Sequence, residues 1–116
     1  MRLLLCLAFW GWVGPARAAD LQHGKQAFSV CAACHDANAQ AAGPPLAGVL
    51  GRKAGSLSGF TYSNSMKRAG FVWDTVRLLE FVQDPQSVVS GTRMPFSGLE
   101  DPAEAADLVA YIEQLK

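Results

Sequence analysis

The spacing of apolar and polar residues along the chain predicts helices, whereas the signals for strands are poor. Four apolar residues near the end of the chain are spaced to fall on one helical face, namely Leu108, Tyr111, Ile112 and Leu115. Before them stand Asp101 as an N-cap, Pro102 at the first helical position and Glu104 where a capping box needs it. The pattern therefore predicts a helix that starts at Pro102.

Similar start and stop signals mark three earlier helices. The first is capped by Asp20 and runs through Phe28 towards Cys34. The second is short, is capped by Ser63 and ends at Gly70. The third runs from Thr75 to Gln83, with Asp74 as its cap and Asp84-Pro85 as its stop. The chain is therefore predicted to be all-α, with about four helices.

Long loops separate these helices. Residues 37–58 are rich in Gly, Ala and Pro without sustained periodicity, and residues 90–99 are again predicted as loop. A domain this small has difficulty burying enough apolar surface, and each ordered residue costs about 1–2 kcal/mol of backbone entropy. Because long loops in compact domains are often wrapped around something, the pattern favours a large apolar cofactor at the centre.

The first residues are typical of a secretory signal peptide. Arg2 gives a positive start, an apolar run from Leu3 to Val13 follows, and Ala16-Arg17-Ala18 has the small-x-small pattern of a cleavage site. The run is shorter than the about 20 residues that span a bilayer, so an uncleaved membrane anchor is the less favoured alternative. We predict residues 1–18 as signal peptide and residues 19–116 as one domain without a permanent membrane anchor.

The charge balance and the number of cysteines limit the possible functions further. The 116 residues include ten basic and ten acidic ones, and removal of Arg2 and Arg17 leaves eight against ten, a net charge of −2. There is no basic run, so the balance is not that of a nucleic-acid binder. Removal of Cys6 leaves Cys31 and Cys34 as the only thiols of the processed chain.

These two cysteines stand in Cys31-Ala32-Ala33-Cys34-His35, the C-x-x-C-H pattern of covalent c-type haem attachment. Each thiol can add to one haem vinyl group, and the histidine can reach the iron as its proximal ligand. Two alternatives use part of the motif. A thioredoxin-like redox pair belongs in a βαβ pattern, which is not visible, and a zinc site needs a fourth ligand, usually from a second Cys or His pair, which the sequence lacks.

A haem iron bound by one histidine needs a second ligand, for which the processed chain offers His23, Met66 and Met94. His23 precedes the motif on the same predicted helix, so it cannot easily cross to the other haem face, and we expect an ordinary surface histidine. Met66 lies in a predicted helix, where methionine usually fills a core. Met94 is favoured because it lies in a loop, which Pro95 stiffens.

From about Gly24 to Leu115 the chain resembles the class I cytochromes c, close to the mitochondrial type and its small bacterial relatives. Individual matches are weak, but their order and spacing are specific. Besides the haem motif they are Gly24 and Phe28, Gly43-Pro44, Gly51-Arg52-Lys53, Gly59-Phe60-Thr61-Tyr62, Trp73, Gly91-Thr92-Arg93-Met94, Phe96, and Leu108 with Tyr111.

The resemblance implies the class I cytochrome c fold, with long loops wrapped around one haem c that is bound covalently through Cys31 and Cys34. It implies that His35 and Met94 are the axial ligands. It further implies that the Pro44 carbonyl accepts the ring N–H of the histidine. The other haem-binding residues that it implies are Arg52, Tyr62, Trp73, Thr92 and Phe96.

The chain departs from the family pattern at positions that affect the surroundings of the methionine ligand and the surface that meets partner proteins. Phe81 stands where the family often has a tyrosine near the methionine sulfur, and Met66 stands where it has a buried asparagine. Gln86 and Ser87 stand where basic residues are common around the exposed haem edge.

The implied function is one-electron transport in the periplasm, by a monomer that meets donor and acceptor proteins through transient contacts at the haem edge. Basic residues available near that edge are Arg93, Lys53, Lys67 and Arg68. The runner-up is a dedicated haem c subunit of a periplasmic dehydrogenase complex. A third class, an enzyme or gas sensor with an open iron site, would need Met94 to be absent or labile, so we expect a carrier and not an enzyme.

Overall fold

The computed structural model describes residues 11, 12, 14, 17–36 and 41–116. The positive start of the predicted signal peptide, most of its apolar run and Cys6 lie outside the described residues, as do residues 37–40 of the first predicted loop. The signal peptide and its cleavage near Ala18 therefore stay predictions.

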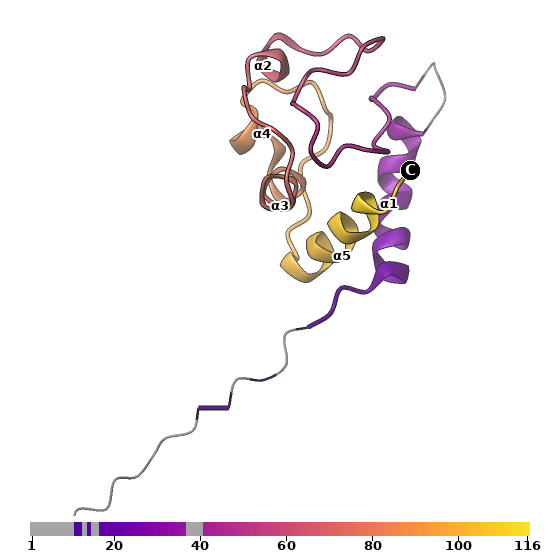
Figure 1. The fold of residues 1–116 in the computed structure, drawn as a ribbon, viewed down its shortest axis with the longest axis vertical. Helices are drawn as coiled ribbons and strands as arrows, with labels where there is room; N and C mark the ends of the chain where they lie inside the picture. The colour runs from indigo at the N-terminus through magenta and orange to yellow at the C-terminus, as the bar shows by residue number, and fades with distance from the viewer. Residues whose placement is uncertain (1–10, 13, 15–16, 37–40) are drawn as a thin grey trace, which may run out of the picture.

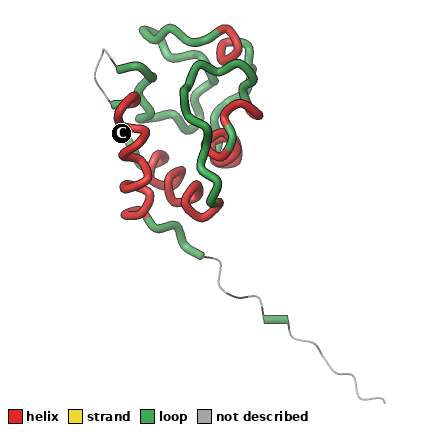
Figure 2. The backbone as a smooth tube through the Cα atoms, turned by 180° about the vertical axis from the view of Figure 1, so that it is seen from behind, coloured by secondary structure: helices red, strands yellow, loops and turns green. Residues whose placement is uncertain are grey.

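The described part of the chain contains five helices, which are connected by loops (Figure 1). They are α1 (Leu21–His35), α2 (Asn64–Lys67), α3 (Thr75–Gln83), α4 (Pro85–Val88) and α5 (Pro102–Glu113). Figure 2 shows no strand among the described residues, where the only β-type pairing is an isolated antiparallel bridge between Lys53 and Val72. The prediction of an all-α fold is confirmed, and none of the described helices is long and apolar enough to cross a membrane.

The helices begin where the capping residues predict. The side chains of Asp20, Ser63, Asp74 and Asp101 each accept at least one backbone N–H from the first turn of the helix that follows. These contacts satisfy amides that have no partner inside the helix. The four predicted helix starts are thus confirmed.

Two details differ from the prediction. The short helix α2 ends at Lys67 and not at Gly70, because Arg68 and Ala69 continue as a turn before the chain turns at Gly70, whose φ is +74°. The helix α4 is not predicted at all. Asp84-Pro85 ends α3 as expected, but the Asp84 carboxylate also accepts the N–H of Ser87 and so starts a new four-residue helix with Pro85 at its first position.

The helices α1 and α5 cross in close contact and hold the two ends of the domain together (Figure 1). At the crossing, a Cβ on Gly24 would lie 2.1 Å from the backbone oxygen of Asp107, so only glycine fits there. The rings of Phe28 and Tyr111 pack with centroids 5.3 Å apart. Leu108 is almost fully buried beside them.

A buried carboxylate on α5 binds the start of α1 and stabilises the contact between the two helices. The side chain of Asp107 is 1% exposed and accepts hydrogen bonds from the backbone amide of Asp20, at 2.9 Å, and the ring Nδ1 of His23, at 2.7 Å. The Arg17 guanidinium lies 3.2 Å from the same carboxylate. His23 is therefore not an ordinary surface histidine, although it does lie outside the central cavity described below.

The pairing makes stability depend on pH in two directions. The hydrogen bond that the ring of His23 donates to Asp107 raises the pKa of His23. The negative charges of Asp107, Glu104 and Asp20 raise it further, and desolvation opposes the shift. The same hydrogen bond, the Asp20 amide and Arg17 lower the pKa of Asp107. The His23 contribution is complete below its unfolded pKa of about 6.5 and is lost as the pH rises through the higher folded pKa. The Asp107 contribution is lost as the pH falls through its lowered pKa.

We therefore predict that His23→Gln destabilises the protein at pH 5 to 6 and loses this difference from the wild type as the pH is raised above neutrality. Denaturant unfolding of both proteins across this range measures the difference. A difference that does not change with pH would show that His23 binds Asp107 only as a neutral ring.

Candidate haem site

The helices and loops enclose a cavity of about 600 Å³ with mostly apolar walls, a size usual for cofactor sites. One wall is the end of α1 and another is α3. Met66 of α2 and Ile112 of α5 also line the cavity, and the rest of the lining comes from loops. All ten residues predicted to bind haem or iron line this cavity, namely Cys31, Cys34, His35, Pro44, Arg52, Tyr62, Trp73, Thr92, Met94 and Phe96.

The two cysteines lie on one face of α1. They are three positions apart in a continuous helix, so their side chains are neighbours, and both thiols are free. Burial raises the pKa of the Cys31 thiol, whereas a thiol-exchange motif needs a lowered one. Among the described residues there is no βαβ unit and no group of three His, Cys, Asp or Glu placed to hold a metal, so neither alternative use of the motif is supported.

His35 is the last residue of α1, and the contacts of its ring fix the orientation of the ring. The chain returns to it through a hydrogen bond from the Gly43 amide to the Cys34 carbonyl, at 2.7 Å. Nδ1 of the ring lies 2.8 Å from the Pro44 carbonyl oxygen. Because a carbonyl can only accept, Nδ1 carries the proton and Nε2 keeps its lone pair. A Cβ at Gly43 would lie 2.6 Å from Cε1 of the ring, so glycine leaves the ring its place.

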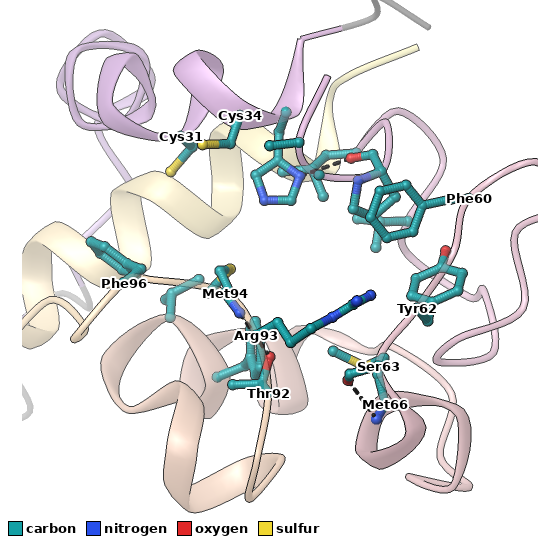
Figure 3. Close-up of a pocket in the computed structure, with 18 of the residues that line it drawn as sticks. Cys31, Cys34, Phe60, Tyr62, Ser63, Met66, Thr92, Arg93, Met94 and Phe96 are labelled. Carbon is teal, nitrogen blue, oxygen red and sulfur yellow. Dashed lines mark hydrogen bonds between the residues drawn. The ribbon is translucent and has the colours of Figure 1, made fainter. Parts of the chain in front are cut away.

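The loop after α4 forms the wall across from the cysteines (Figure 3). Thr92 is buried, and its hydroxyl oxygen lies 3.4 Å from the backbone N–H of Met94. The Met94 side chain lines the cavity and is half-buried. The Arg93 guanidinium donates to the Thr61 carbonyl at 2.6 Å, which ties this loop to the loop on the neighbouring wall.

Aromatic side chains and one arginine complete the walls. Trp73 is buried and packs edge-on against Phe71 and Phe81, with centroids 4.8 and 5.0 Å away. Tyr62 packs against Phe60, at 4.8 Å. The Arg52 guanidinium donates to the Pro45 carbonyl at 3.0 Å, which holds the loop that carries Pro44.

Several residues that shape the cavity are not among those predicted from the sequence. Leu78 and Val82 line it beside Phe81, and all three are buried on one face of α3. Their spacing of three and four residues could have indicated that face. Leu46 and Val49, from the predicted long loop, also line the cavity, and no local pattern marks them.

These residues fit a covalently bound haem. Two free thiols stand on one helical face, an imidazole nitrogen with its lone pair is beside them, and a thioether lines the opposite wall. The remaining lining is largely apolar, as a porphyrin requires. At the two departures from the family pattern, Phe81 and Met66 line the cavity without contributing a strong hydrogen-bond donor.

Comparisons with known proteins identify the family. The family model for cytochrome c matches residues 21–116. The chain is 44% identical over 91 residues to cytochrome c2 iso-2 of Magnetospirillum fulvum, a match that covers 77% of this chain and 95% of the relative. It is 39% identical over 105 residues to cytochrome c2 of Blastochloris viridis, covering 88% and 83%.

The fold has a counterpart among solved structures. The cytochrome cH structure from Methylobacterium extorquens superposes with a TM-score of 0.76 at 39% sequence identity, covering 81% of this chain and 97% of that one. Together with the cavity and its motif, these matches show that the chain belongs to the class I cytochrome c family, as a haem-based electron carrier with one haem c bound through Cys31 and Cys34.

Proposed function

We propose that the protein is a periplasmic one-electron shuttle whose haem iron is bound by His35 and Met94. The observation that carries this proposal is the position of Met94, on the cavity wall across from the cysteines of α1 (Figure 3). The His35 ring supports it, because the hydrogen bond to Pro44 leaves Nε2 as the coordinating nitrogen.

The haem supplies the one-electron chemistry when it is bound. Cys31 and Cys34 fix its position through thioether bonds, and Pro44 fixes the orientation of His35. Leu78, Phe81 and Val82 on α3 exclude water from the cavity, and an apolar, methionine-ligated site favours the reduced state more than a wet one does. Arg52, Tyr62, Trp73, Thr92 and Phe96 complete the proposed binding set.

The cavity opens where a partner protein can reach it. Val30 lines the cavity and is 65% exposed, so it places an apolar contact at the rim. Arg93, which also lines the cavity, is exposed, as are Lys53, Lys67 and Arg68 elsewhere on the surface. With a processed net charge of −2, these few cations steer acidic partners only weakly. The encounter we propose is therefore brief and depends only weakly on ionic strength.

Absorption spectra of the oxidised and reduced protein, purified from the periplasmic fraction, test the proposal. We expect the reduced spectrum of a c-type haem and, in the oxidised protein, the absorption band of an iron–thioether bond. A protein that lacks this band does not use Met94 as a ligand at rest. Purification as a single chain supports a shuttle, whereas stable association with a dehydrogenase would assign it to that complex instead.

A further inference from the structure

Gln86 joins α4 to the loop that carries Met94 by two hydrogen bonds. Its side-chain Nε2 donates to the carbonyl oxygen of Thr92 at 3.0 Å, and its Oε1 accepts the backbone N–H of Gly91 at 3.1 Å. The carbonyl can only accept and the amide can only donate, so a single orientation of the glutamine satisfies both. The side chain therefore clamps the two-residue segment Gly91-Thr92, at the N–H of its first residue and at the carbonyl of its second.

The clamped segment lies at the start of the loop. Gly91 turns the chain with a φ of +87°, and the Thr92 amide donates to the Val89 carbonyl at 3.0 Å. Met94 follows two residues later, with its amide directed at the Thr92 hydroxyl. At the far end of the loop, the Leu99 amide donates to the Val82 carbonyl at 2.9 Å. The loop is thus held at both ends, and Gln86 holds the end nearer to Met94.

We propose that Gln86 is a positioning residue that keeps this loop closed and so sets how readily Met94 leaves the iron. The inference rests on the proposed function, since it takes Met94 as the ligand. The basic residues that are common in the family at this position could donate to the Thr92 carbonyl but could not accept the Gly91 amide. At this position the chain therefore has two hydrogen bonds to the loop in place of a surface charge.

The variant Gln86→Ala removes both hydrogen bonds, and we expect the opened loop to become about tenfold more populated. Imidazole binding to the oxidised protein reports this population, because the probe binds only when Met94 has left and its apparent affinity scales with the open fraction. The expected result is an imidazole affinity raised by about tenfold.

Two further variants separate the clamp from general damage to α4. Ser87→Ala changes the next residue, whose hydroxyl donates to the Asp84 carbonyl at the start of α4. It should leave the imidazole affinity within about twofold of the wild type. Gln86→Glu keeps the size and the acceptor but places a carboxylate against the Thr92 carbonyl, so it should raise the affinity at least as much as Gln86→Ala does.

The outcomes also separate this inference from the proposed function. If the wild-type oxidised protein lacks the iron–thioether band, Met94 is not the ligand and the proposed function fails together with the inference. If the band is present but Gln86→Ala or Gln86→Glu binds imidazole as the wild type does, the inference alone is overturned. Equal effects of the alanine variants at positions 86 and 87 would also overturn it.

Discussion

Replacing Met94 by alanine is expected to lower the midpoint potential and to open the iron to added ligands. A thioether stabilises the reduced iron more than water or imidazole does, and axial ligands set haem potentials over a range of about 0.8 V. The decrease in midpoint potential should therefore be a sizeable part of that range. Redox titration measures the potential, and cyanide or imidazole binding measures access to the iron.

The second methionine in the cavity provides the matched control. Met66 also lines the cavity, from α2, and Met66→Leu keeps its bulk while removing its sulfur. This variant should retain the iron–thioether band and bind added ligands as the wild type does. An unchanged potential in Met94→Ala, or loss of the band in Met66→Leu, would remove Met94 as the proposed ligand.

Gly24→Ala is expected to destabilise the folded protein by about 1–3 kcal/mol or more, because it overpacks a tight contact. The added Cβ would lie 2.1 Å from the backbone oxygen of Asp107, and a backbone atom cannot move aside without separating α1 from α5. This result is opposite in sign to the usual effect in a helix, where alanine is about 0.5–1 kcal/mol more favourable than glycine. Guanidinium unfolding of the haem-loaded protein measures it.

Lys25→Ala is the control for this experiment, because Lys25 is the next residue of α1 and is exposed. A surface change of this kind should alter the free energy of unfolding by less than about 0.5 kcal/mol. If Gly24→Ala proved as stable as Lys25→Ala, the two helices would have to be more loosely packed than described above.

Local signals in the sequence predict the helices well because a capping side chain bonds to amides only two or three residues away. The carboxylate of Asp101 and the hydroxyl of Ser63 act in this way. The helix α4 is missed because four residues are too few for a periodic pattern, and Asp84-Pro85 is interpreted only as a stop. A residue that caps one helix as another ends has no distinct sequence signal.

Long-range contacts could not be predicted in the same way. Asp107 is a polar residue within an apolar helix, and its partners Asp20 and His23 lie more than 80 residues earlier. Leu46 and Val49 reach the cavity from a loop without periodicity. The ten proposed haem and iron residues could be named in advance because the family resemblance supplied their order and spacing, which composition and periodicity do not.

The Asp107 carboxylate contacts residues on both sides of the predicted cleavage position, Arg17 before it and Asp20 after it. Cleavage after Ala18 would remove the guanidinium and create a positively charged α-amino group one residue before the Asp20 amide. The precursor and the exported chain would then neutralise the same carboxylate with different cations. Protein expressed without export would therefore differ from the exported form at its terminal helix pair, and the two forms should unfold with different dependence on pH.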